Sequence, residues 1–410
     1  MDLSRIIPIL ALLALGAATL PAQDFTRRGG DYETTFEKRF DMAPGGALEV
    51  RLSAGDLRIV AADGNAVTVR HRMRLDAYTE AEARKARDAA EAGYRRDGNH
   101  LVIDQEGAPG WIEQYLEIRL PASFDVATRL GQGDIAIDGV SGRLDLTTGQ
   151  GDIDLLNGGG VVELRSGAGD LTIRNLAGQV DGNTAAGDID VSGGGESLRL
   201  RTSGGDVRIE KANSVYVATA GGRIVVRDID GEVEARTSGG DIRAEQCRGA
   251  AELRTSGGDI ELAGMSDRVE ARTSGGDIRG ADMVGSVVVQ TSGGDIDLRE
   301  VSGEVNAQTS AGRIRLRLAA SDPSRPHRVS LETASGDIEL WIPESLPATI
   351  EAEVHGAGGG WSHFDIHSDF PLTRTVSGGG DIIRKTGDIN GGGDRIVLEC
   401  YHGDIYIRKR

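Results

Sequence analysis

The 410-residue sequence is poor in cysteine and in basic charge, and it has only one long apolar run. Its two cysteines, Cys247 and Cys400, could form one disulfide at most; because Cys247 shares its position in a repeat with Met, Ile and Val, we expect a buried free thiol there. A net charge of −18 argues against a nucleic-acid partner, whose binding depends on basic clusters. Beyond residue 20 no apolar stretch approaches the roughly 20 residues of a membrane-spanning helix, so we expect no transmembrane span in the mature chain.

The apolar run lies at the start of the chain, between Ile6 and Leu20. Arg5 precedes it and a polar segment begins at Asp24, which is the pattern of a secretory signal peptide over residues 1–23. Cleavage is expected between Ala18 and Gln23. The mature chain is therefore predicted to be exported, to the periplasm, the cell surface or the medium.

A repeated phrase, Thr-Ser-Gly-Gly-Asp-Ile, dominates the rest of the sequence. Complete copies begin at Thr237, Thr255, Thr273 and Thr291, and looser copies keep a step of 18 residues apart from one step of 17 and one of 24. A fixed short period is typical of a solenoid, and alternating apolar and polar residues on both sides of the Gly-Gly turn predict two short strands per repeat. We therefore expect an all-β fold, a parallel β-solenoid (β-helix-like) with 18-residue coils. Parallel coiling is favoured over a hairpin meander because each strand then meets its equivalent in the next turn.

Positions within the repeat predict how each side chain is used. Four apolar columns should face inward, among them Ile224, Ile242, Ile260, Ile278, Ile296 and Ile314, and a looser one of Ala212, Ile229, Cys247, Met265, Met283 and Val301. A threonine before the turn in eight successive coils, from Thr202 to Thr333, predicts a structural ladder of hydrogen bonds from coil to coil. We expect the glycine pair that follows to supply the positive φ of a tight reversal.

An acidic column follows the glycine pair. It consists of Asp134, Asp152, Asp170, Asp188, Asp206, Arg223, Asp241, Asp259, Asp277, Asp295 and Arg313, with Asp337 after the 24-residue step. The favoured interpretation is that each Asp accepts hydrogen bonds from turn amides. Calcium binding is the alternative, but the nonapeptide calcium repeat has a different spacing, and Arg223 and Arg313 occupy the same position.

Charged residues form regular columns on the outside of the predicted coils. Glu234, Glu252 and Glu270 occupy one column, and Arg236, Arg254 and Arg272 occupy the next column on the same face. Adjacent acidic and basic columns offset the repulsion within each column. This pattern indicates a solvated face and not a ligand site.

The ends of the chain depart from the repeat. Residues 24–125 should form a mixed α/β capping block with one helix near 79–95, which a capping box at Thr79 and Glu82 opens. The solenoid is expected over residues 126–344. An irregular segment, 345–410, should return to repeat-like strands.

The C-terminal segment holds an unusual set of side chains for a chain that is 4% aromatic. His363 and His367 would share one strand face and, with Asp365 or His355, could hold a metal ion in principle. No spacing here is diagnostic of a metal site. We therefore assign no metal, no cofactor-binding residue and no catalytic residue, and we expect no cofactor.

The signal peptide, the mixed N-terminal block, the Thr-Ser-Gly-Gly-Asp-Ile repeats and the closing strand from Tyr401 to Ile407 together resemble a known family. This is the bacterial putative adhesin family of β-strand-repeat envelope proteins, whose function is unknown. The resemblance implies the architecture and no catalytic or binding residues. Some relatives are linked to envelope-stress responses, which implies a sensing or protective role as a rival to adhesion.

Three functions follow as hypotheses. The leading one is a non-enzymatic envelope or secreted protein whose long face binds a surface polymer, a glycan or an envelope protein through many weak contacts. Envelope-stress sensing or protection is the alternative, since it also requires only an exported, stable surface. A polysaccharide-active β-helix enzyme is third, and its candidate irregular places are the coil with Tyr216 and Arg223 and the insertion over residues 321–327 with Asp322 and Arg325.

Overall fold

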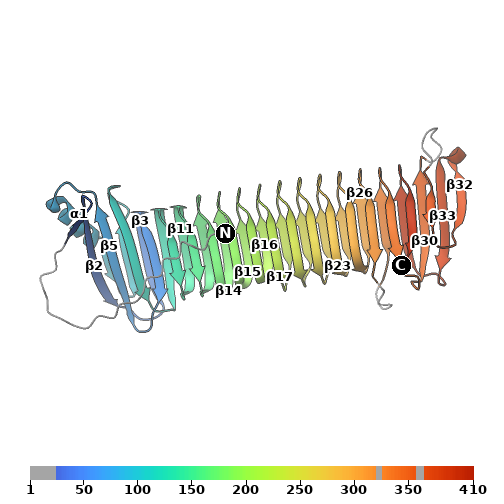
Figure 1. The fold of residues 1–410 in the computed structure, drawn as a ribbon. Helices are drawn as coiled ribbons and strands as arrows, with labels where there is room; N and C mark the ends of the chain where they lie inside the picture. The colour runs from blue at the N-terminus through green and yellow to red at the C-terminus, as the bar shows by residue number, and fades with distance from the viewer. Residues whose placement is uncertain (1–24, 320–325, 357–363) are drawn as a thin grey trace.

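The computed structural model of the chain describes residues 25–319, 326–356 and 364–410. Figure 1 shows a long, narrow rod of stacked strands, with a helix at the N-terminal end. All 35 strands of the described residues belong to one sheet, so the expected all-β fold is confirmed. The α-helix α1 (Glu80–Ala92) has 13 residues, and within the described ranges no helix has the length and apolar character needed to cross a membrane.

Each coil contributes strands to two parallel stacks. Stack A contains the strands that follow the Asp of the motif, such as β19 (Ile242–Cys247), and stack B contains the strands that precede its Thr, such as β20 (Ala251–Arg254). In stack A Ile242 pairs in parallel with Ile260, which lies 18 residues later. The parallel solenoid with 18-residue coils is therefore confirmed.

The same two stacks continue through most of the chain. In the later coils stack A contains β17 (Ile224–Ile229), β21 (Ile260–Met265), β23 (Ile278–Val284), β25 (Ile296–Ser302), β27 (Ile314–Leu318) and β29 (Ile338–Ile342). Stack B contains β18 (Val233–Arg236), β22 (Val269–Arg272), β24 (Val287–Gln290), β26 (Val305–Thr309) and β28 (Val329–Thr333). The earlier coils are built by β9 (Phe124–Gln132), β10 (Ile135–Asp138), β11 (Ser141–Gln150), β12 (Ile153–Leu156), β13 (Gly159–Ser166), β14 (Leu171–Thr184), β15 (Ile189–Arg201) and β16 (Val207–Ala218).

The core lies between the stacks and is filled by the predicted inward columns. Members of the isoleucine column such as Ile242 and Ile260 are 0% exposed, and Met265 of the looser column is 1% exposed. Cys247 and Cys400 are both buried and unpaired, as free thiols. Small and β-branched side chains suit this narrow core because neighbouring coils present equivalent positions to each other.

At the N-terminal end the chain does not stack its coils in sequence order. The strands β3 (Gly46–Ala54) and β4 (Asp56–Ala61) form a coil that lies between β7 and β8 (His100–Gln105 and Ile112–Leu120) on one side and β9 and β10 on the other. The antiparallel strands β5 (Ala66–Leu75), β2 (Asp31–Asp41) and β1 (Thr26–Arg28) extend the sheet beyond β8. The helix α1 begins with the predicted capping box at Thr79 and Glu82, and β6 (Tyr94–Asp97) follows it. Terminal strand edges are thereby covered.

The C-terminal end is built in the same way. The strands β34 (Asp394–Cys400) and β35 (Ile405–Lys409) insert between the β28–β29 coil and a last coil made of β30 (Ala348–His355) and β31 (Ile366–Ser368). The antiparallel strands β33 (Ile382–Ile389) and β32 (Thr373–Ser377) extend the sheet from β30. A short 3-10 turn, η1 (Gly378–Gly380), joins these two strands. The chain therefore returns to solenoid geometry before Arg410.

The glycine pair of the motif serves a different purpose from the expected one. In the four complete copies, all of which lie within the described residues, neither glycine has a φ in the left-handed region. The second glycine is packed against the preceding coil, because a Cβ on Gly258 would lie 2.0 Å from the carbonyl oxygen of Gly240. A Cβ on Gly257 would have its nearest neighbour 3.6 Å away. The prediction of positive φ is wrong here, and the second glycine is required because no Cβ fits between the coils.

Positive φ instead marks the corner at which the chain leaves stack A. This position, five residues after the Asp of the motif, holds Asn157, Asn175, Lys211, Asp228, Gln246, Asp282 and Glu300, with φ between 51° and 59°. One left-handed residue breaks the alternation of the strand, so that Gln246 faces solvent and Cys247 faces the core. The corner therefore depends on a conformation that costs most non-glycine residues about 1–2 kcal/mol.

Candidate binding face

The turn between stack B and stack A is held by a threonine in most coils, and Ser166 and Cys400 take its position in two others. The hydroxyl of Thr255 donates to the carbonyl oxygen of Gly240 in the preceding coil at 2.9 Å and accepts from the backbone N–H of Gly258 at 3.3 Å. The same two contacts recur at Thr184, Thr202, Thr219, Thr237, Thr273 and Thr291. Because Thr255 is only 7% exposed, this ladder is structural and its hydroxyl is not available to a ligand.

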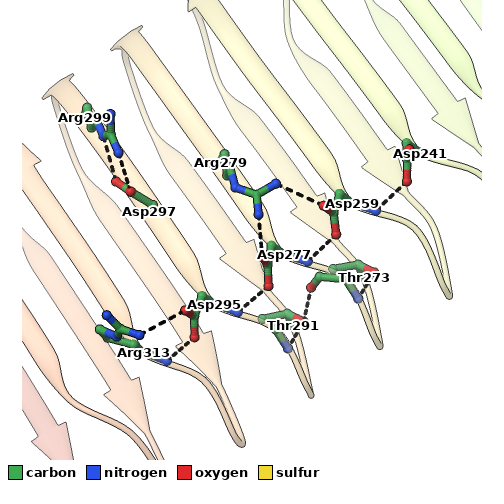
Figure 2. Close-up of polar contacts among 12 residues, drawn as sticks. Asp241, Asp259, Thr273, Asp277, Arg279, Thr291, Asp295, Asp297, Arg299 and Arg313 are labelled. Carbon is green, nitrogen blue, oxygen red and sulfur yellow. Dashed lines mark hydrogen bonds and ion pairs between the residues drawn. The ribbon is translucent and has the colours of Figure 1, made fainter.

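The acidic column forms a second ladder on the same turn. Figure 2 shows the backbone N–H of Asp277 donating to Oδ1 of Asp259 at 2.8 Å, and the next rung repeats the contact from Asp295 to Asp277. The backbone N–H of Arg313 donates to Asp295 in the same way at 2.8 Å. An arginine fits this position because the rung needs its backbone N–H. The interpretation of the Asp residues as hydrogen-bond acceptors for turn amides is confirmed.

Arginines of stack A bind the outer oxygens of this ladder and the carboxylate of Asp297, which lies on β25 beside the ladder. Arg279 donates to Oδ2 of Asp259 at 3.0 Å and to Oδ2 of Asp277 at 2.6 Å, so that it joins two successive coils (Figure 2). Arg299 donates to both carboxylate oxygens of Asp297 at 3.0 and 2.7 Å. These hydrogen bonds from Arg299 lower the pKa of Asp297, and partial burial opposes them. Arginine and aspartate side chains are therefore paired with each other along this side of the coils.

A shallow depression of about 260 Å³ opens on stack A beside these arginines. It arises because Ala263 and Ala281 occupy an outward column in which the flanking coils carry Glu245 and Arg299. The residues around it include Arg243, Glu245, Glu261, Arg279, Asp297 and Arg299. The depression thus combines an apolar floor with a rim of both charge signs. Sequence analysis missed it, although two alanines in a column of long side chains are a visible signal.

Stack B carries the charged columns that the sequence predicts. Arg236 lies 3.1 Å from Glu252 of the next coil, and Arg254 lies 3.3 Å from Glu270 of the coil after that. The side chain of Arg236 is 44% exposed, so each such pair contributes less than about 1 kcal/mol. The columns form a solvated surface in which each charge has a partner.

Of the residues that could host an enzyme site, the structure describes Tyr216 and Arg223, and these two belong to different parts of their coil. Tyr216 lies on stack B beneath Arg199 and Arg201, whose guanidinium carbons are 5.0 and 5.2 Å from its ring. Arg223 lies at the turn, 3.8 Å from Asp241. Asp322 and Arg325 lie outside the described residues.

The histidines of the C-terminal segment lie on different stacks. His355 stacks on Tyr401 with a centroid distance of 4.6 Å, and His367 stacks on Tyr406 at 5.0 Å. Asp365 is a further rung of the acidic ladder, since its backbone N–H donates to Asp404 at 2.8 Å. His363 lies outside the described residues. In the part of the chain that the structure covers, no three His, Cys, Asp or Glu side chains are placed to hold a metal ion.

Comparison with known proteins identifies the repeat. The family model described as Toastrack DUF4097, a domain of unknown function, matches residues 192–285 and 283–408. No curated protein matches the chain.

Two solved structures match. One is described as a putative cell adhesion protein from Clostridium sporogenes; it has 10% identity and a TM-score of 0.19, over 92% of this chain and all of that one. The other, a putative adhesin from Bacteroides fragilis, has 13% identity and a TM-score of 0.18, over 75% of this chain and 97% of its own. Since the family model covers more than half of the sequence, and the stacked 18-residue coils account for the repeat that it matches, the chain belongs to the Toastrack DUF4097 family.

Proposed function

We propose that this chain is a non-enzymatic, exported protein of the cell envelope or cell surface, and that its rod binds a surface polymer, a glycan or an envelope protein along stack A. One observation carries the proposal: equivalent outward positions recur at each coil, at the spacing of about 4.8 Å between adjacent strands. Along one such column, Arg243, Glu261, Arg279, Asp297 and Arg315, the charge alternates in sign, so a partner with a repeating chemical unit meets similar contacts at every second coil. Many weak contacts of this kind add up to avidity.

The pairing of charged side chains around the depression supports binding over catalysis. Around the depression Arg243 pairs with Glu245, and Arg279 and Arg299 pair with their own aspartates. A hydrolytic site needs carboxylates with distinct roles and perturbed pKa values at a defined separation. Here each of these carboxylates is paired with an arginine of its own coil, so the depression is suited to hold a polymer and not to cleave it. Export rests on the predicted signal peptide at residues 1–23.

The test is retention of the purified mature chain on immobilised peptidoglycan, surface polysaccharides and whole cells, with newly released reducing ends measured in the same samples. One variant combines Arg279→Gln and Arg299→Gln at the depression. Its control combines Arg119→Gln and Arg165→Gln, which removes the same charge from arginines paired with Glu117 and Glu163 in other coils. A second variant deletes residues 148–165, one period of 18, and keeps the register of the stacks.

We expect retention without release, weaker retention for the variant at the depression than for its control, and a loss of avidity for long polymers when one coil is deleted. Release of reducing ends would refute the proposal in favour of an enzyme. Absence of retention on every surface would also refute it and would favour a sensing or protective role in the envelope.

A further inference from the structure

Aromatic and arginine side chains meet on stack A near the C-terminal end of the rod. Arg317 of β27, Trp341 of β29 and Arg408 of β35 are register neighbours in one outward column. The guanidinium carbon of Arg317 lies 4.8 Å from the Trp341 ring, and that of Arg408 lies 5.3 Å from the ring of Tyr406 on its own strand. We call Arg317, Trp341, Arg408 and Tyr406 the terminal patch. It joins coils that are distant in sequence, because β35 is inserted next to β29.

The arginines of this patch differ from the paired arginines in the coils that precede it on stack A. Arg279, Arg299 and Arg315 each have a carboxylate within 3.3 Å. Arg317 and Arg408 are exposed, and neither has a carboxylate within 4 Å in the described part of the chain. Contact with the aromatic rings holds each guanidinium in place while its N–H groups remain free to donate. The patch is therefore a preorganised pair of cations on a protein whose net charge is −18.

The spacing of these cations restricts the ligand. Arg317 and Arg408 are two rungs apart, which is about 10 Å at the usual spacing of adjacent strands. A nucleic-acid strand carries a phosphate about every 3.4 Å, and its additional phosphates would face the acidic ladder. A polymer with more widely spaced anionic groups can place one group on each arginine and keep a neutral segment over Trp341. Sugars suit that middle position because the ring edge offers both apolar contact and an indole N–H donor.

From this arrangement we infer that the terminal patch is a binding site for an anionic polysaccharide that runs along the axis of the rod. Each arginine binds one carboxylate or phosphate group by bidentate hydrogen bonds, and Trp341 contacts the sugar between them. This inference rests on the proposed function, because it names the polymer class that the rod binds and the place where its charged groups are held.

The experiment measures affinity of the mature chain for polygalacturonate, yeast phosphomannan, dextran and single-stranded DNA at 0.05 and 0.2 M salt. The test variant combines Arg317→Gln and Arg408→Gln. The matched control combines Arg199→Gln and Arg201→Gln, which removes the same charge from two arginines that also lie over an aromatic ring, that of Tyr216 on stack B. Thermal melting of all proteins is recorded in parallel.

We expect binding to polygalacturonate or phosphomannan over dextran and DNA, with the preferred polymer revealing whether carboxylate or phosphate is recognised. The test variant should lose about 10- to 100-fold in affinity for that polymer, with an unchanged melting temperature, while the control loses less than about threefold. Equal losses in both variants would refute the inference, because they would show only an effect of net charge. Tightest binding to DNA would also refute it. Tight binding to dextran alone would sink the inference but leave the proposed function standing, whereas no binding to any polymer would refute both.

Discussion

Replacing Gly258 by alanine tests whether close contact between coils determines the motif. The added Cβ would lie 2.0 Å from the carbonyl oxygen of Gly240 and 2.4 Å from its carbon, so the two coils must separate by about 1.4 Å to restore ordinary contact. That shift strains the hydrogen bonds that Thr255 makes to Gly240 and to Gly258. Overpacking costs about 1–3 kcal/mol and each weakened hydrogen bond about 1 kcal/mol, which gives a local loss of about 3–5 kcal/mol.

The matched variant is Gly257→Ala in the same motif. Its Cβ would meet nothing closer than 3.6 Å, and the reduced freedom of the unfolded chain should make it neutral or stabilising by about 0.5 kcal/mol. Because solenoids unfold as coupled repeats, the assay is native-state hydrogen exchange of backbone amides in residues 237–276, together with thermal melting. Exchange there should accelerate by roughly 100-fold or more for Gly258→Ala and stay unchanged for Gly257→Ala. Equal effects of the two substitutions would refute the steric argument.

Three further perturbations test the same structure. Thr255→Val keeps the shape of the side chain but removes both hydrogen bonds of its rung, so local stability measured by hydrogen exchange should fall by about 1–2 kcal/mol. The control is Ser256→Ala at an exposed neighbouring position, where the change in local stability should be near zero. Gln246→Gly should raise the melting temperature, by relieving about 1 kcal/mol of left-handed strain at φ 54°, whereas a lower melting temperature would contradict that account of the corner. Burial lowers the pKa of His71 to about 4, and the hydrogen bond that its Nε2 donates to Oε1 of Gln114 opposes this shift. As pH falls, the unfolded state therefore binds a proton before the folded state does, and stability should decline by about 3 kcal/mol between pH 6.5 and 4. The free energy of unfolding, measured by urea denaturation at a series of pH values, should depend less on pH in His71→Leu. An unaltered pH dependence would exclude His71 as its source.

Much of the fold could be predicted because each repeat packs against neighbouring repeats of similar sequence. When Ile242, Ile260 and Ile278 occupy equivalent positions 18 residues apart, parallel stacking brings identical side chains together, and the inward columns follow. The roles of Thr255 and Asp259 were also predictable, since hydroxyl and carboxylate groups next to a turn satisfy backbone amides. The conformation of the glycine pair was not predictable in this way. Its requirement comes from the preceding coil and not from the local backbone.

The sequence by itself determined the period, the parallel coil and the inward columns of this protein, because those depend on side chains that recur at short, regular distances. The tertiary structure alone decided the order of the end coils. At the N-terminal end, β3 and β4 lie between the β7–β8 coil and the β9–β10 coil. At the C-terminal end, β34 and β35 lie next to β28 and β29. These placements depend on which distant strand pairs with each unpaired edge, and no local sequence pattern indicates that choice. The terminal patch around Trp341 follows from that order, since Arg408 meets Trp341 only because β35 lies next to β29, whereas the depression at Ala263 and Ala281 follows from the regular 18-residue stacking.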